Sequence, residues 1–345
     1  MKQFIQAYTL FLGLILLLIA PGCSDDDTPN LYEKRMTIGR ALLEVQAPDV
    51  DDILPYYTDD IEYHDPIVDI NGIEDMTEFL NRLIKEASPN LVTIVEDETL
   101  SGDTYCATWI MSGDFLEVPY EARGISIFKF MPNSELVYYQ RDYYSEGDIM
   151  VTIPGLDEAI GAFRTYYRCA VDPTFECPFA PPSSAIKSQL KSTQTLFSTD
   201  QLTVARNLVE INAENWMNIL PMLSTEYAYR DPIVSIDGSE TMAAFLARLF
   251  EGSVNLITTV EDETLVNDVY MATWTMSGEF NGASFSAPGM SIVKFVEGTS
   301  NIYYSRDYYT EGDVMLGIPD LSEAVTGFRS YYRSAVDPSF PPQNE

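Results

Sequence analysis

The chain of 345 residues carries 53 acidic against 20 basic side chains, a formal net charge of −33. A surface this negative repels nucleic acids and anionic membrane surfaces, so neither is expected as a partner. At 46% hydrophobic and 12% aromatic residues, the chain is too apolar for an acidic disordered protein and predicts a well-cored globular body.

The first residues predict export. Lys2 precedes an apolar run over Leu10–Ala20, which is too short to span a bilayer and suits the core of a signal peptide. The run ends at Ala20-Pro21-Gly22-Cys23, which resembles a bacterial lipobox. Residues 1–22 are therefore interpreted as a lipoprotein signal peptide and Cys23 as the lipidation site. The alternative is an ordinary secretory signal in which the cysteine is incidental.

Residues 23–30 are interpreted as an acidic tether because Asp25-Asp26-Asp27 follows the cysteine. The acidic tract resembles the signal that marks surface-exported lipoproteins in some bacteria, and it equally suits a solvated spacer. The lipobox implies a lipid-anchored protein of the bacterial cell envelope, and Ser24 favours the outer membrane, on either its periplasmic or its external face. The lipid would be the only contact with a membrane.

In the first half, periodicity predicts helices followed by strands. Helices are expected over 36–45 and 50–57, with an acidic turn at 58–60 and a short strand over 61–65 that ends at Pro66. Asn71-Gly72 predicts a turn before the next helix. The remaining expected elements are a helix over 74–87, strands over 91–100, 104–115, 122–130 and 136–144, and an added helix over 156–167.

The second half repeats the first. Asp65-Pro66-Ile67-Val68 recurs at 231–234, Arg141-Asp142-Tyr143-Tyr144 at 306–309, and Tyr166-Tyr167-Arg168 at 331–333. A period of 165–166 residues is too long for a solenoid unit, which has ~20–50 residues. The repeat therefore predicts two complete domains over 31–177 and 199–341. A linker over 178–198, rich in Pro, Ser, Thr and Lys, would join them.

This order of helices and long strands is an α+β layout. The residues resemble the SnoaL-like group of the nuclear-transport-factor-2-like superfamily, through Asp65-Pro66, Gly72 at a helix start, the strands at 107–113 and 124–130, and the closing Arg141-Asp142-Tyr143-Tyr144. The resemblance implies a cone in each half, with a curved antiparallel sheet wrapped on N-terminal helices and an apolar pocket for a compact hydrophobic molecule. The superfamily includes isomerases, cyclases, epoxide hydrolases and non-catalytic members, so the fold alone does not define an activity.

Strand alternation indicates which side chains line the cones. Tyr105, Ala107, Trp109 and Met111 share one strand face, and the same four residue types recur in the second half. Such a face is either a tight core or a pocket wall. The candidate ligand-binding residues are Tyr63, Tyr105, Trp109, Met111 and Ser126 in the first half, and Tyr229, Tyr270, Trp274, Met276 and Ser291 in the second.

Asp65 and Asp231 are candidate general bases. Both resemble the proton-shuttling aspartate of ketosteroid isomerases, which stands directly before a proline at the end of this strand. A carboxylate in an apolar cone would have a raised pKa and could move a proton next to a carbonyl. The positions of the enolate-stabilising acids carry Ala41 and Ser126 in the first half, with Asn207 and Ser291 in the second, which leaves only a serine hydroxyl as donor. The alternative is an Asp-Pro turn whose carboxylate binds backbone amides.

Asp142 and Asp307 resemble the last-strand acid of SnoaL-like cyclases and limonene-epoxide hydrolases, and are candidate acid–base partners. Where the hydrolases have Arg and Asp on the middle strand, this chain has Gly124 and Ser126. The alternative is a buried hydrogen-bond cluster that closes the sheet.

Cysteine and histidine positions predict one cross-link and no metal site. Cys169 and Cys177 occur only in the first half, and a local disulfide is expected between them in an exported protein. The only histidine, His64, has Arg230 as its counterpart, which disfavours a catalytic or metal role. The chain contains no phosphate loop, zinc motif or dinucleotide fingerprint, so no cofactor is expected.

Three functions follow as hypotheses. The first is an exported lipoprotein whose cones bind a small apolar or aromatic molecule. The second is an isomerase, cyclase or hydrolase that uses a pocket aspartate as general base. The third is a non-catalytic interaction module at the cell surface.

The faces opposite the expected pocket walls carry Ile127, Tyr139 and Tyr143, with Ile292, Tyr304 and Tyr308 as counterparts. These apolar faces predict that the two sheets pack together as an intramolecular pseudo-dimer. A linker of about 20 residues, which spans on the order of 25 Å, permits that pairing. Two independent domains on a flexible tether are the alternative.

Overall fold

The computed structural model describes residues 30–178, 200–280 and 282–340. Cys23, the proposed signal peptide, nearly all of the acidic tether and nearly all of the linker lie outside the described residues. Among the helices within these ranges, none combines the length and the apolar character needed to cross a membrane.

The first domain starts with helix α2 (Leu31–Leu43) and three short helices, η1 (Ala47–Asp49), α3 (Val50–Ile53) and η2 (Leu54–Tyr56). Its strands are β1 (Tyr57–His64), β2 (Asp69–Asn71), β3 (Val92–Ser101), β4 (Thr104–Phe115), β5 (Val118–Phe130) and β6 (Val137–Tyr144). Helix α4 (Ile73–Leu80) and its π-helical continuation η3 (Asn81–Ala87) separate β2 from β3. Helices α5 (Gly147–Met150) and α6 (Asp157–Val171) follow the sheet.

The second domain repeats this order. Helices α7 (Gln201–Val209) and α8 (Trp216–Ile219) and the turn η4 (Leu220–Met222) precede the sheet, and α9 (Ser239–Gly252) lies against it. The strands are β7 (Leu223–Arg230), β8 (Ser235–Asp237), β9 (Ser253–Val266), β10 (Val269–Phe280), β11 (Ala283–Phe295) and β12 (Ile302–Tyr309). Helices α10 (Glu311–Met315) and α11 (Pro319–Val336) end the described chain.

Each domain contains one six-stranded sheet, in the orders β2-β1-β6-β5-β4-β3 and β8-β7-β12-β11-β10-β9. All neighbouring strands are antiparallel except β1 with β6 and β7 with β12, which are parallel. The predicted fold class, α+β with two tandem domains, is confirmed. One local expectation is wrong: residues 57–60, expected as a helix end and an acidic turn, belong to β1.

Tertiary pairing explains the longer first strand. Tyr57 pairs with Val137 of β6, and its side chain is buried together with those of Ile61 and Tyr63. Asp59 and Asp60 between them are exposed, which made this segment look like a turn in the sequence. A strand at the middle of a sheet is stabilised by hydrogen bonds to its neighbours, and these override weak local preference.

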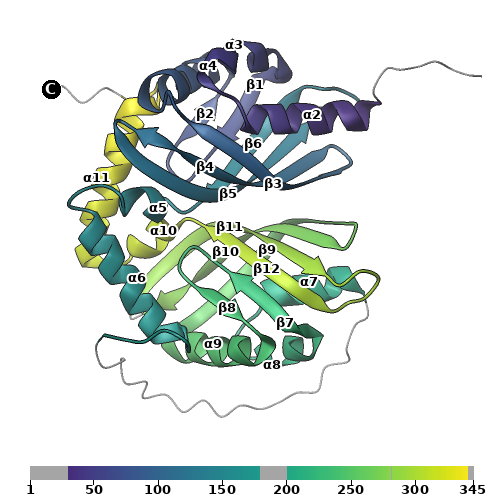
Figure 1. Ribbon diagram of the computed structural model, residues 1–345, viewed down its shortest axis with the longest axis vertical. Coiled ribbons are helices and arrows are strands. Elements are labelled where there is room, and N and C mark those ends of the chain that lie inside the picture. The colour runs from purple at the N-terminus through teal and green to yellow at the C-terminus, as the bar shows by residue number, and fades with distance from the viewer. Residues whose placement is uncertain (1–29, 179–199, 281, 341–345) are drawn as a thin grey trace, which may run out of the picture.

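The two sheets pack face to face (Figure 1). Their contact is an apolar cluster of matched residues: Cys106, Ile125, Ile127 and Tyr143 from the first domain, and Met271, Met290, Ile292 and Tyr308 from the second. Two ion pairs flank it, Lys129 with Asp262 at 2.8 Å and Lys294 with Asp97 at 2.6 Å. The reciprocal pairs show that the two domains are related by approximate two-fold symmetry.

The C-terminal helices of the two domains are exchanged. Helix α6, which follows the first sheet in sequence, packs on α9 of the second domain, and α11 packs on η3 of the first (Figure 1). The sequence predicts an amphipathic helix after each sheet, but its apolar face can bury against either sheet. Only the assembled pair of domains shows which one it covers.

Candidate functional site

Each domain encloses a mainly apolar cavity between the concave face of its sheet and its helices. The cavity volumes are about 80 Å³ in the first domain and about 100 Å³ in the second. One ordered water needs ~10–15 Å³, so each cavity has room for several waters or one compact molecule. Met76, Phe79 and Leu80 of α4 form part of the first wall, and Met242, Phe245 and Leu246 of α9 form part of the second.

Asp65 lies where β1 ends, and its two carboxylate oxygens do different things. Oδ1 accepts hydrogen bonds from the backbone N–H groups of Ile67 at 2.6 Å and Val68 at 2.7 Å. Oδ2 instead lies 3.3 Å from the hydroxyl group of Tyr63 and 3.4 Å from that of Tyr144, at the wall of the cavity. The turn therefore holds one oxygen and leaves the other available for chemistry.

Tyr63 bridges two carboxyl groups. Its hydroxyl lies 3.0 Å from Asp142 Oδ2 and 3.3 Å from Asp65 Oδ2. A tyrosine hydroxyl carries one proton, so it can donate to only one of these oxygens. The second contact becomes a hydrogen bond only when a carboxyl group donates to the tyrosine oxygen. The arrangement thus favours one shared acidic proton between Asp65 and Asp142.

The surroundings of both carboxyl groups favour that proton. Burial among apolar side chains raises the pKa of Asp65 to about 7, even though the backbone N–H groups of Val68 and Ile67 act in the opposite direction. Burial also raises the pKa of Asp142. Both residues are half-buried at the wall of the cavity. Near neutral pH the pair therefore carries a proton in a substantial share of molecules.

Hydrogen-bond donors on the sheet orient the carboxyl group of Asp142. The Ser126 hydroxyl donates to its Oδ1 at 2.6 Å, and the Trp109 indole N–H donates to Ser126 Oγ at 2.8 Å. The Gln140 amide adds a contact at 3.3 Å, and the Tyr57 hydroxyl holds that amide at 2.8 Å. This chain of donors fixes the carboxyl group in the low-dielectric interior, where hydrogen bonds are strong.

The second domain repeats the same geometry. Tyr229 lies 2.9 Å from Asp307 and 3.3 Å from Asp231, and Ser291 donates to Asp307 at 2.6 Å. Asp231 Oδ1 accepts from the backbone N–H groups of Ile233 and Val234. Burial again raises the pKa of Asp231 to about 7 and raises that of Asp307.

The two sites differ in the side chains that donate hydrogen bonds to Asp142 and Asp307. Ser305 takes the position of Gln140, and its hydroxyl bonds to Tyr227 rather than to the carboxyl group. Asp307 therefore has two side-chain donors, Ser291 and Tyr229, where Asp142 has three. The charged form of Asp142 is consequently the better stabilised of the two.

The model of the SnoaL-like domain matches residues 40–139 and 204–300, which together are more than half of the chain. The chain belongs to the SnoaL-like family. Each matched region contains most of the strands of one sheet, so the protein has two tandem SnoaL-like domains.

Similar solved structures each correspond to about one SnoaL-like domain. A protein with a ketosteroid isomerase-like fold from Catenulispora acidiphila, in complex with trimethylamine, is 18% identical and covers 34% of this chain and 91% of its own, with a TM-score of 0.30. An epoxide hydrolase of the LEH-like type from Mycobacterium tuberculosis is 15% identical, with coverage of 37% and 92% and a TM-score of 0.29. A nuclear-transport-factor-2-like protein of unknown function from Cytophaga hutchinsonii is 13% identical, with coverage of 33% and 97% and a TM-score of 0.29. No curated protein sequence matches the chain.

Most of the candidate residues lie at the cavities of the SnoaL-like domains. The residues that line them are Tyr63, Asp65, Trp109, Met111 and Asp142 in the first domain, and Tyr229, Asp231, Trp274, Met276, Ser291 and Asp307 in the second. Ser126 lies behind the wall, between Trp109 and Asp142.

Tyr105 and Tyr270 lie outside the cavities, unlike their strand neighbours. Both rings are fully buried, and their hydroxyl groups donate to Glu98 and Glu263. The Tyr105 ring lies directly beneath Gly39 of α2. The helix covers this end of the strand, so these two residues contribute to the core rather than to a ligand site.

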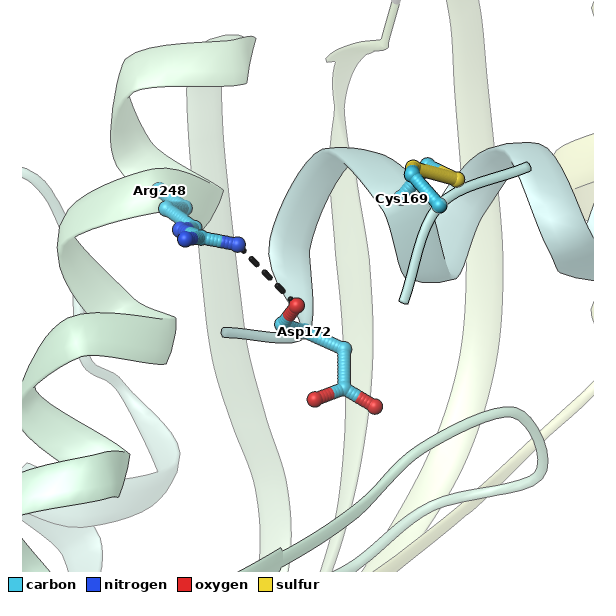
Figure 2. Close-up of a disulfide and its surroundings, with 4 residues drawn as sticks. Cys169, Asp172 and Arg248 are labelled. Atoms are coloured by element: carbon cyan, nitrogen blue, oxygen red, sulfur yellow. Dashed lines mark hydrogen bonds between the residues drawn. A yellow bond between two sulfur atoms is a disulfide. The ribbon is translucent and has the colours of Figure 1, made fainter. Parts of the chain in front are cut away.

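The remaining candidates lie away from the cavities. His64 contacts Asp69 at 2.5 Å at the surface. Cys169 and Cys177 form a disulfide at the end of α6, with Cα atoms 5.3 Å apart (Figure 2). Among the described residues, no group of three or more His, Cys, Asp and Glu side chains has the geometry of a metal site.

Sequence reasoning missed several residues of the site. Tyr144 and Gln140 contact the acid pair, and Tyr332 of α11 lines the first cavity. Phe163 and Tyr167 of α6 line the second. The repeat of Tyr166-Tyr167-Arg168 at 331–333 was the available signal, but it did not indicate which cone these tyrosines enter.

Proposed function

We propose that each SnoaL-like domain binds one compact, mainly apolar molecule through a single hydrogen-bonding oxygen. The observation that carries this proposal is the tyrosine-bridged acid pair, Asp65 with Asp142 and Asp231 with Asp307, at the wall of an enclosed apolar cavity. A site of this kind combines apolar contact area with a few polar groups that orient the ligand.

The chemistry of the pair selects the ligand class. A protonated carboxyl group donates a hydrogen bond to a carbonyl or hydroxyl oxygen, whereas an anion would meet two buried acids and a chain of net charge −33. Neutral ketones, phenols and lactones therefore fit better than carboxylates or phosphates. An amine would instead need the acids in their ionised form.

A matched pair of probes tests this proposal. We expect acetophenone to bind and to raise the thermal midpoint, and α-methylstyrene, which has the same shape but no oxygen, to bind more weakly. Because ionised Asp65 cannot donate, acetophenone affinity should fall above pH 7, by up to about tenfold per pH unit. Calorimetric titration from pH 6 to pH 9 measures this dependence.

Asparagine variants provide the control. In the double variant Asp65→Asn, Asp231→Asn, the asparagine amide can donate a hydrogen bond to the ketone at every pH. Acetophenone affinity should therefore lose its pH dependence. Acetophenone affinity that rises with pH in the wild type would contradict the donor role of the protonated acids. If neither probe binds, even at pH 6, the proposal is wrong and a packing or interaction role is favoured.

Proton transfer is the second candidate function, and the raised pKa of Asp65 favours it. A base with a pKa of about 7 is well matched to catalysis near neutral pH. Ionised Asp65 would take a proton next to a ligand carbonyl, while Tyr63 or protonated Asp142 would donate to the carbonyl oxygen. In deuterium oxide, a bound enolisable ketone should lose its α-proton NMR signals with the wild type but not with the double asparagine variant. Equal rates with both proteins would exclude this function.

We also propose that Cys23 carries a lipid that holds the two domains at the bacterial outer membrane. The support is the lipobox-like Ala20-Pro21-Gly22-Cys23 after the apolar run, and the acidic tether that follows. In a bacterial host, Cys23→Ser should move the protein from the membrane fraction to the soluble fraction. Mass spectrometry of the wild-type N-terminal peptide without a diacylglyceryl modification would refute the proposal.

A further inference from the structure

The exchanged helices place one tyrosine in each cavity from the opposite half of the chain. Tyr332 of α11 lines the first cavity beside Tyr63, Asp65 and Asp142. Tyr167 of α6 lines the second, beside Asp231 and Asp307. Tyr332 is 5% exposed whereas the adjacent Tyr331 is 44% exposed, so the helix directs one ring inward and the other toward solvent.

These tyrosines are connected to the acid pairs. Tyr332 lies close to Tyr144, whose hydroxyl donates to Asp65 Oδ2 at 3.4 Å. In the second domain Tyr167 lies close to Tyr309 and interacts electrostatically with Asp231. Burial raises the pKa of both exchanged tyrosines, so their phenols stay neutral and able to donate.

Aromatic contacts hold each exchanged ring in the cavity wall. Tyr332 stacks on Phe115, with ring centroids 5.0 Å apart and planes inclined by 21°. Tyr167 contacts the equivalent Phe280 with centroids 5.4 Å apart. Such pairs add stabilisation beyond the area that they bury.

Polar contacts then hold the middle and the C-terminal end of each helix on the other domain. Midway along the helices, Arg329 binds Glu146 of the first domain at 2.8 Å, and Arg164 binds Glu311 of the second at 2.7 Å.

At the helix ends, Arg82 donates to the Asp337 carbonyl at 3.2 Å, and Arg248 donates to the Asp172 carbonyl at 3.0 Å (Figure 2). A cation at a helix C-terminus satisfies free carbonyl groups and complements the helix dipole.

We propose that both ligand sites are composite, with Tyr332 and Tyr167 acting as site residues supplied by the opposite half of the chain. The ligand class is the neutral, oxygen-bearing apolar molecule of the proposed function, on which this inference rests. Each tyrosine shapes one wall of the cavity beside the acid pair. Neither half of the chain contains a complete site by itself.

Site-resolved NMR of the mature chain tests the inference. Labelling the Asp carboxyl carbons with ¹³C follows the titration of the acid pairs, and Asp65→Asn and Asp231→Asn assign the Asp65 and Asp231 signals. We expect Tyr332→Phe to raise the midpoint of Asp65, because the buried carboxylate loses a stabilising hydroxyl dipole, and to leave Asp231 unchanged. Tyr167→Phe should do the reverse.

Binding provides the second readout in the same spectra. Tyr332→Ala should weaken acetophenone at the Asp65 site by about tenfold and change the Asp231 site by less than about twofold. Thr326→Ala, at an exposed position of the same helix, is the control and should alter neither site.

A Tyr332→Phe variant that moves the Asp231 signal, or that leaves the Asp65 signal in place, overturns the inference. Absence of acetophenone binding in the wild type contradicts the proposed function alone, since the titration midpoints do not depend on a ligand. If Tyr332→Ala does not fold, the phenylalanine variants still decide the result.

Discussion

Arg329→Met is expected to lower the free energy of unfolding by about 3–5 kcal/mol, because it leaves a buried carboxylate without its partner. Glu146 has no exposed side-chain surface, and the Arg329 guanidinium contacts it at 2.8 and 3.1 Å while also binding Asp313. Arg164→Met should lower the free energy of unfolding by a similar amount, because it leaves the equally buried Glu311 without its partner. Urea denaturation of the mature chain measures both losses.

The pH dependence of this loss follows from Glu146. Burial raises its pKa to about 7, and Arg329 acts in the opposite direction. Such a carboxyl group has a higher pKa in the folded state than in the unfolded state. The folded state therefore loses stability as pH rises from the unfolded-state pKa toward the folded-state pKa. Without Arg329 that pKa rises further, so the loss should be larger at pH 8 than at pH 5.

Two variants serve as controls for the ion pair between Arg329 and Glu146. Arg123→Met breaks an ion pair with Glu96 whose side chains are 37% and 35% exposed, and it should cost at most about 1 kcal/mol. Adding Glu146→Gln to Arg329→Met removes the orphaned charge and should restore part of the stability. A loss below about 1 kcal/mol for Arg329→Met would show that the exchanged helix is not held by this pair.

Gly124→Ala is expected to cost about 1–3 kcal/mol, although its backbone conformation suits any residue. A Cβ atom at Gly124 would lie 2.2 Å from the Trp109 ring, so the indole must move. That movement breaks the 2.8 Å hydrogen bond from Trp109 to Ser126, which orients Asp142. We therefore expect acetophenone affinity at the first site to fall together with stability, in calorimetric and denaturation measurements.

Gly161→Ala provides the matched control. A Cβ atom there meets no other atom within 4 Å, and the position lies inside α6. Replacing a helical glycine by alanine reduces the entropy of the unfolded chain, so this variant should gain about 0.4–1 kcal/mol. Gly289→Ala, whose Cβ atom would lie 2.2 Å from Trp274, should behave like Gly124→Ala at the second site. A neutral effect at both positions would mean that the indoles move freely.

Individual residues show what could be predicted about the site. Asp65 and Asp231 were identified because a carboxylate before proline at a strand end recurs in both halves. The two alternatives for Asp65, capping backbone amides or facing the cavity, are both realised, one by each carboxylate oxygen. Tyr105 was placed wrongly because alternation assigns a residue to a strand face without indicating which part of that face a helix covers.

Sequence patterns predicted the two domains, the α+β layout, the apolar cones and the four aspartates, since these follow from a repeat, from strand periodicity and from motifs within one strand or turn. They could not predict that Tyr63 bridges two of these aspartates, or that Tyr332 and Tyr167 cross to the opposite domain. The pattern of an amphipathic helix specifies which of its faces is buried, but not the surface against which that face packs. The two domains offer nearly identical surfaces, so the choice between them depends on contacts far apart in sequence, such as Arg329 with Glu146 and Arg164 with Glu311.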